Sequence, residues 1–149
     1  MAGFRKILVP IDFSTHSARA LQTGIELAKT FGAKLHLLHC YQINVGAISP
    51  YGLVIPESFD RDIREAASRQ LAQWREKVTA QKIEVEAEVS PMFPSEAIAS
   101  TAERIGADLI VMGTRGLSGI KHVMLGSVAE RTVRIAPCPV LTVKATGEA

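Results

Sequence analysis

Apolar residues recur along the chain with two periods, one typical of buried strands and the other of amphipathic helices. Residues 7–9 form an apolar run that indicates a buried strand, and Pro10, which cannot donate to a ladder, marks its end. In residues 16–31, apolar side chains return every three or four positions, which predicts a helix. Gly32 is then predicted to end this helix in a left-handed backbone conformation.

The same alternation continues through the chain and predicts strands separated by helices. The expected strands cover residues 5–11, 34–40, 83–89, 108–112 and 140–143, and the expected helices cover residues 16–31, 57–80, 95–105 and 127–136. Residues 83–89 alternate apolar and acidic side chains, which is typical of a strand at a sheet edge with one wet face. Alternating strands and helices favour an α/β fold, an open parallel sheet with helices on both faces. We expect one domain over residues 1–149, with residues 145–149 as a frayed tail.

The amino-acid composition indicates which kinds of binding partner and compartment to expect. Of the 149 residues, 47 % are hydrophobic and the net charge is only +2, so a globular core is expected without a general attraction to DNA or membranes. No segment approaches the roughly 20 apolar residues of a membrane helix, and no signal-peptide core is visible. Cys40 and Cys138 have neither metal-ligand nor disulfide spacing. The simplest expected compartment is a reducing cytoplasm.

The loop after residues 108–112 carries the candidate chemistry. Its glycines are Gly113, Gly116, Gly119 and Gly126. Gly126 and Ser127 lie directly at a helix start, whose free N–H groups and positive dipole end favour phosphate. Arg115 and Lys121 add positive charge. Each residue also has a simpler explanation, because glycines often only turn the chain and a serine often only caps a helix, so the combination points to phosphate more than any single residue does.

Several other chemistries lack their motifs. The chain contains no G-x4-G-K-[ST] loop, no G-x-G-x-x-G after the first strand and no G-x-S-x-G elbow. No second carboxylate is expected beside Asp12, which argues against a phospho-acceptor site. His36 and His39 lie three apart in a strand and so face opposite sides, and His39 is expected to be a hydrogen-bonded structural residue. His16 and His122 are expected to be exposed.

The glycine loop matches G-x2-G-x9-G-[ST], with Gly113, Gly116, Gly126 and Ser127 in register, and here the chain resembles ATP-binding universal stress proteins. Residues 7–12, 37–39 and 138–143 resemble the same family. The resemblance covers essentially the whole chain. It implies a five-stranded sheet in the order 3-2-1-4-5, an adenine nucleotide alpha-hydrolase-like or Rossmann-like arrangement, with the nucleotide across the ends of strands 1 and 4.

The resemblance also implies a set of binding residues. The expected nucleotide-binding residues are Pro10, Ile11, Asp12, Cys40, Met112, Gly113, Arg115, Gly116, Gly126, Ser127 and Val128. Asp12 would lie near the ribose or a Mg²⁺ or Mn²⁺ ion bound with ATP. Cys40, where the family more often has valine, would line the adenine pocket. Backbone amides and the Ser127 hydroxyl would hold the phosphates.

By the same resemblance, residues 140–143 would pair with a second copy to form a homodimer, which would also cover an apolar edge. The expected function is a stress-response regulator with slow or no ATP hydrolysis. Nucleotide binding would change its conformation or dimer geometry, and an unknown protein partner would recognise that change. Two alternatives stay open: a weak Mg-dependent ATPase that uses Asp12, and a nucleotide-independent interaction module.

The long connection over residues 41–56 is expected to act as a lid over the adenosine.

Overall fold

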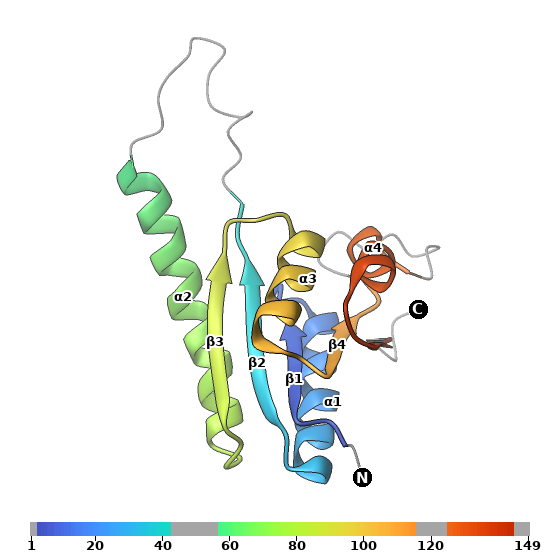
Figure 1. The fold of residues 1–149 in the computed structure, drawn as a ribbon. Helices are drawn as coiled ribbons and strands as arrows, with labels where there is room; N and C mark the ends of the chain where they lie inside the picture. The colour runs from blue at the N-terminus through green and yellow to red at the C-terminus, as the bar shows by residue number, and fades with distance from the viewer. Residues whose placement is uncertain (1–2, 43–56, 116–124, 145–149) are drawn as a thin grey trace.

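A computed structural model describes residues 3–42, 57–115 and 125–144. These residues form a parallel five-stranded sheet and four helices (Figure 1). The strands are β1 (Lys6–Pro10), β2 (Lys34–Cys40), β3 (Val85–Ser90), β4 (Leu109–Gly113) and β5 (Val140–Val143), and the helices are α1 (Thr15–Phe31), α2 (Glu57–Thr79), α3 (Pro94–Ile105) and α4 (Ser127–Ile135). The strand order is β3-β2-β1-β4-β5, which confirms the expected fold class and sheet order.

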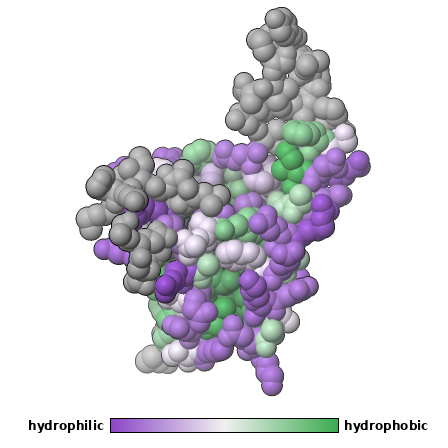
Figure 2. All heavy atoms as spheres, turned by 180° about the vertical axis from the view of Figure 1, so that it is seen from behind, coloured by the Kyte–Doolittle hydropathy of each residue, from purple (hydrophilic) through white to green (hydrophobic). Residues whose placement is uncertain are grey.

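The sheet is the middle layer of three. Helices α1 and α2 cover one face, and α3 and α4 lie against the other (Figure 1). Alternate residues of each strand enter different cores: Val9 and Leu37 pack with α1 and α2, whereas Leu8 and Leu38 pack with α3 and α4. Viewed from behind, the surface over α1 and α2 is largely hydrophilic (Figure 2), as the charged outer face of α2 predicts.

The helix ends follow the local sequence. Ser14 caps α1, because its hydroxyl accepts the backbone N–H of Ser17. Gly32 and Gly106 end α1 and α3 with φ of 68° each, a left-handed backbone that favours glycine. Strand β3 lies at one edge of the sheet, as its alternation of apolar and acidic residues predicts.

Several expectations need correction. Strand β1 is Lys6–Pro10 rather than residues 5–11, and β4 is Leu109–Gly113 rather than residues 108–112. His16 is buried, with 8 % of its surface exposed, because the first turn of α1 packs against the end of β4, where a Cβ on Gly113 would lie 2.9 Å from the Cβ of His16. Helix α3 begins at Pro94 rather than Ser95, since proline suits the first helical position. Strand β3 begins at Val85 rather than Ile83.

Other expectations concern parts of the chain that the structure leaves out. The proposed lid, apart from Tyr41 and Gln42, and also His122 and the tail lie outside the described residues. None of the helices in the described part of the chain is long and apolar enough to cross a membrane.

The central strands separate toward their carboxyl ends. Strand β1 pairs with β2 through five residues, from Lys6 to Pro10. In the described sheet, β1 pairs with β4 through only two, Ile7 and Leu8, both near its amino end. At the other end the backbone N–H of Ile11 donates to Leu38 of β2 over 2.8 Å, so β1 follows β2 and not β4. Strand order reverses at β1, which is where open α/β sheets leave a crevice for ligands.

Candidate functional site

A cleft of about 840 Å³ opens at the carboxyl ends of the strands, bordered by the starts of α3 and α4. Most of the nucleotide-binding residues expected from the sequence line it, and they come from three strand ends and one helix start. These lining residues are Pro10, Ile11, Asp12, Cys40, Met112, Gly113, Arg115, Gly126, Ser127 and Val128. The remaining one, Gly116, lies outside the described residues. Residues 116 positions apart in sequence, such as Asp12 and Val128, therefore share one cavity wall.

A network of short polar side chains organises the β1–α1 loop. One carboxylate oxygen of Asp12 accepts two hydrogen bonds from Ser14, one from the backbone N–H over 3.0 Å and one from the hydroxyl. Ser17 closes the network, because its hydroxyl accepts the N–H of Asp12 over 3.3 Å and donates to the carbonyl of Ser14 over 3.1 Å. Asp12 is thus oriented by the helix cap that follows it.

An aromatic cluster holds the same loop from the opposite face of the sheet. Phe13 has a φ of 66°, a backbone conformation that is costly for a bulky residue. Its ring packs against His39 at 4.4 Å and Trp74 of α2 at 5.5 Å between centroids. Nδ1 of His39 lies 2.7 Å from the carbonyl oxygen of Ile11 and donates to it, since a carbonyl only accepts. This confirms His39 as a hydrogen-bonded structural residue.

The opposite wall depends on close backbone approaches. The N–H of Gly126 donates to the carbonyl of Thr114 over 2.5 Å, which joins the start of α4 to the end of β4. A Cβ on Gly126 would lie 3.0 Å from that same carbonyl oxygen, and one on Gly113 would lie 3.1 Å from the carbonyl oxygen of Arg115. A side chain at either position would therefore force its neighbours to shift, which the sequence pattern alone did not distinguish from simple turns.

The first turn of α4 brings hydrogen-bond donors to the cleft. Gly126 is the N-cap residue, and the first intrahelical bond runs from the N–H of Glu130 to its carbonyl over 2.9 Å. The N–H groups of Ser127, Val128 and Ala129 precede that bond, and the first N–H groups of a helix have no intrahelical acceptor. All three residues line the cleft. Together with the positive end of the helix dipole, they make a wall whose chemistry suits an anion.

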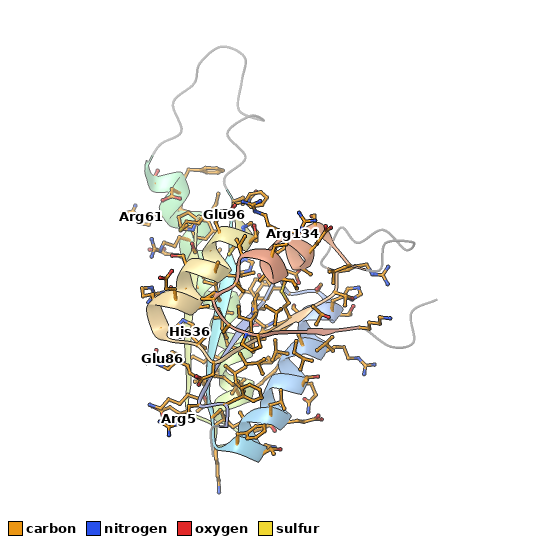
Figure 3. The ribbon with its side chains drawn as sticks, turned by 45° about the vertical axis from the view of Figure 1, so that its right-hand side comes forward. Arg5, His36, Arg61, Glu86, Glu96 and Arg134 are labelled. Carbon is orange, nitrogen blue, oxygen red and sulfur yellow. The ribbon has the colours of Figure 1, made fainter. Side chains whose placement is uncertain are left out.

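Ion pairing fixes α4 beside α3 at this edge. Nε and Nη2 of Arg131 donate to Glu96 over 2.9 and 2.7 Å, and Ser95 donates to the second carboxylate oxygen over 2.9 Å. The hydrogen bond from Arg131 and then that from Ser95 lower the pKa of Glu96. Glu96 stands at the start of α3, close to the cleft (Figure 3). The start of α3 is therefore linked directly to the middle of α4.

Cys40 closes the end of the cavity over β2. Burial raises the pKa of its thiol to about 11, so it is neutral at physiological pH and behaves as a small apolar group. With Leu38 and Ile98 it makes this end of the cleft apolar, in contrast to the amide-lined wall at α4.

The sequence analysis missed part of the lining. The additional residues are Ser17, Leu38, Gln42, Phe93, Pro94, Ile98, Thr114, Leu125, Ala129 and Glu130. Ser17 carried a usable signal, since it follows the helix cap Ser14 by three residues. Phe93 and Pro94 carried none, because the periodicity did not indicate that the β3–α3 connection reaches the cavity.

Among the described residues, no three histidine, cysteine, aspartate or glutamate side chains gather closely enough to hold a metal ion. A divalent cation at this site would therefore take most of its ligands from phosphate oxygens and water, as Mg²⁺ commonly does. Asp12 and Glu130 are the carboxylates among the described residues that line the cleft. Glu130 is held by Arg134, whose Nη2 donates to it over 2.7 Å.

Comparison with known proteins identifies the family. The model of the universal stress protein family matches residues 3–144. The chain belongs to the universal stress protein family. It is 37 % identical to universal stress protein YxiE of Bacillus subtilis over 147 residues, which cover 95 % of this chain and 99 % of the relative.

Solved structures share the universal stress protein fold. Hypothetical protein MJ0577 superimposes with a TM-score of 0.80 at 25 % identity, covering 99 % of this chain and 100 % of its own. A universal stress protein in complex with cAMP has a TM-score of 0.66 at 25 % identity, covering 97 % of this chain and 100 % of its own. At least one structural relative therefore binds an adenine nucleotide.

Proposed function

We propose that this universal stress protein binds ATP or a related adenine nucleotide in the cleft and acts as a nucleotide-responsive regulatory module of the stress response. The observation that carries the proposal is the contrast between the two ends of one cavity. An amide-lined wall at the start of α4 suits phosphates, and an apolar end beside Cys40 suits a nucleobase. The cAMP complex of a structural relative supports adenine as the base.

The residues would divide the ligand between them. The N–H groups of Ser127 and Val128, with the glycine-rich loop that includes Gly116 and Arg115, would hold the phosphates. Asp12 would lie at the ribose or at a Mg²⁺ or Mn²⁺ ion carried by the phosphates. Its orientation by Ser14 supports this role, because hydrogen bonds from the hydroxyl and the backbone amide of Ser14 hold the carboxylate in one position.

We further propose that the active form is a homodimer paired through β5. Strand β5 is an edge of the sheet, and Leu141 is 40 % exposed on it. Val133 and Ile135 of the neighbouring α4 are also exposed, by 50 % and 39 %. An apolar edge strand invites pairing with a second copy, which would cover these side chains.

Calorimetric titration of the purified protein with Mg-ATP, AMP, cAMP and Mg-GTP, with phosphate release followed in the same samples, tests the proposal. Saturable binding of adenine nucleotides with little phosphate release supports a regulatory module. Turnover that disappears in Asp12→Ala while binding persists would instead favour the weak ATPase. Absence of binding to all four nucleotides would remove the ligand and leave a nucleotide-independent interaction module.

A further inference from the structure

Phe93 is an exposed aromatic side chain at the rim of the cleft. Its residue surface is 58 % exposed, although a phenyl ring gains free energy by leaving water. It lies between β3 and α3, and it lines the same cavity as the apolar residues Leu38, Cys40 and Ile98. A ring in this position would be covered by a ligand that fills the cavity.

Phenylalanine at position 93 does not stabilise helix α3. Phe93 is the N-cap of α3, where serine, threonine, aspartate and asparagine are preferred because their side chains accept a free backbone N–H. A phenyl group has no acceptor and cannot cap. The chain therefore carries at this position a residue that is unfavourable for helix stability, a pattern common where function conflicts with stability.

The backbone presents the ring in a defined place. Pro94 follows directly and restricts Phe93 to extended backbone, with φ of −59° and ψ of 137°. The carbonyl of Phe93 accepts the N–H of Ala97 over 2.9 Å, which attaches it to the first turn of α3. A ligand that stacks on this ring would not have to order the loop that carries it.

The position of Phe93 along the cleft assigns it to the nucleobase. The phosphate-binding wall lies at the end of β4 and the start of α4, and β3 is three strands away in the order β3-β2-β1-β4. Strands are about 4.8 Å apart, so the ends of β3 and β4 are separated by roughly 14 Å at the level of the sheet. Phe93 belongs to the connection from the end of β3 to the start of α3. A nucleotide whose phosphates meet α4 would extend its base toward Cys40 and Phe93.

We propose that Phe93 is the stacking platform for the base of the bound nucleotide, an inference that rests on the proposed nucleotide-binding function. Stacking on an aromatic face tolerates different bases, because every base has a π-face. Phe93 therefore contributes affinity for the base in general, while preference for adenine over guanine is set by other contacts.

The test compares Phe93→Ala with Met92→Ala by calorimetry. Met92 is the preceding residue, 47 % exposed, and is not among the described residues that line the cleft, so its truncation removes similar apolar surface from the same loop. Phe93→Ala should weaken ATP binding by about 5-fold to 150-fold, the range for loss of one base–aromatic stack, and should weaken GTP binding by a similar factor. Met92→Ala should bind ATP as the wild type does.

Inorganic tripolyphosphate, which has no base, separates stacking from a general effect on the site. Its ability to compete with ATP should be equal in wild type and Phe93→Ala. A parallel loss of tripolyphosphate competition, or unchanged ATP affinity in Phe93→Ala, would overturn the stacking role. If wild type binds no nucleotide at all, the proposed function fails as well, and that outcome is distinct from an unchanged variant.

Two further variants guard against a trivial loss of folding. Phe93→Ser supplies a capping hydroxyl, so its melting temperature should equal or exceed that of wild type while ATP affinity falls. A fall in melting temperature together with affinity would identify Phe93 as a structural residue and contradict the proposal. Phe93→Trp should retain affinity, and its added indole emission should be quenched by ATP; emission that ignores saturating ATP would also contradict it.

Discussion

Replacing Gly126 by alanine should separate nucleotide binding from folding. The added Cβ would lie 3.0 Å from the carbonyl oxygen of Thr114, whereas ordinary van der Waals contact begins at 3.4 Å. The two backbones must therefore move apart by about 0.4 Å, the difference between these distances. Thr114 cannot yield easily, because its own N–H donates to Val143 of β5 over 3.1 Å. The start of α4 is the part that moves.

Two magnitudes follow from this displacement. Weakening the 2.5 Å bond from Gly126 to Thr114 should cost no more than the net value of one hydrogen bond, about 0.5–1.5 kcal/mol of unfolding free energy. Phosphate contacts suffer more, because hydrogen bonds to a charged group contribute about 1.5–3 kcal/mol each. Loss of one such contact corresponds to a fall in ATP affinity of about 10-fold to 150-fold.

Gly106→Ala is the matched control. Gly106 has a φ of 68°, a Cβ added to it would meet nothing within 4 Å, and it ends α3 away from the cleft. Alanine in that left-handed conformation should cost about 1–2 kcal/mol of stability. Calorimetry with ATP and thermal melting should show weak binding with modest destabilisation for Gly126→Ala, and unchanged binding for Gly106→Ala. Wild-type affinity in a folded Gly126→Ala protein would refute the phosphate-binding role of this helix start.

Three other predictions use the rest of the molecule. Burial acts to raise the pKa of Glu88, but hydrogen bonds from Arg104 and His36 outweigh it and lower that pKa below its ordinary 4.5. The resulting stabilisation, at most about 1 kcal/mol for such an exposed pair, should be present at neutral pH and absent in Glu88→Gln. In acid melts of the wild type it should be lost as the pH falls through the folded pKa. Leu141→Lys should convert the proposed dimer to a monomer in light scattering, and an unchanged mass would count against pairing through β5. With a pKa of about 11, Cys40 should carry about 100-fold less thiolate at pH 8 than a thiol of ordinary pKa 9.0. Iodoacetamide should therefore alkylate it slowly, and ATP should slow the reaction further, as mass mapping can show.

The contacts of Glu88 that carry the pH prediction lie on the β2–β3 side of the sheet. His36 and Glu86 lie on the sheet well away from Glu96 at the start of α3 (Figure 3). Nε2 of His36 is 2.6 Å from Glu88, and its Nδ1 is 3.6 Å from Glu86. Loss of the Glu88 contacts in acid should therefore weaken the β2–β3 side of the sheet. Equal acid sensitivity of wild type and Glu88→Gln would show that other carboxylates dominate.

The fold was predictable because its strands and helices carry clear periodic signals. The run at residues 7–9 is fully buried, and Gly32 ends its helix in the expected left-handed conformation. Element ends were less accurate, by one residue at α3, at both ends of β1 and at both ends of β4, and by two at the start of β3. Pro94 and Ile83 are compatible with more than one local structure. Hydrophobic periodicity reflects whether side chains are buried, but the end of a helix or strand is set by its last backbone hydrogen bond, which the periodicity does not reveal.

The site was predictable only where a motif lay at a strand end. Gly113, Gly126 and Ser127 belong to a spaced pattern, and they line the cleft. His16 was expected to be exposed but is buried, since its environment depends on the approach of α1 to β4, two elements far apart in sequence. Phe93 was missed for the same reason: only the three-dimensional order β3-β2-β1-β4 brings the β3–α3 connection to the cavity rim.

The backbone of Thr114 offers a physical route from nucleotide to dimer. Its carbonyl accepts the N–H of Gly126 at the phosphate end of the cleft, and its N–H donates to Val143, the last residue of β5. One residue's backbone is therefore shared by the proposed phosphate site and the proposed dimer strand. A shift of the start of α4 reaches the end of β5 only to the extent that Thr114, which its hydrogen bond to Val143 holds, moves with it. By thermodynamic linkage the effect is reciprocal: each bound ATP changes the dimerisation constant by the same factor by which dimerisation changes the ATP affinity of one site. Leu141→Lys, which lies outside the cleft lining, should then change ATP affinity by that factor, and a regulator whose dimerisation is indifferent to ATP would leave affinity unchanged in the monomeric variant.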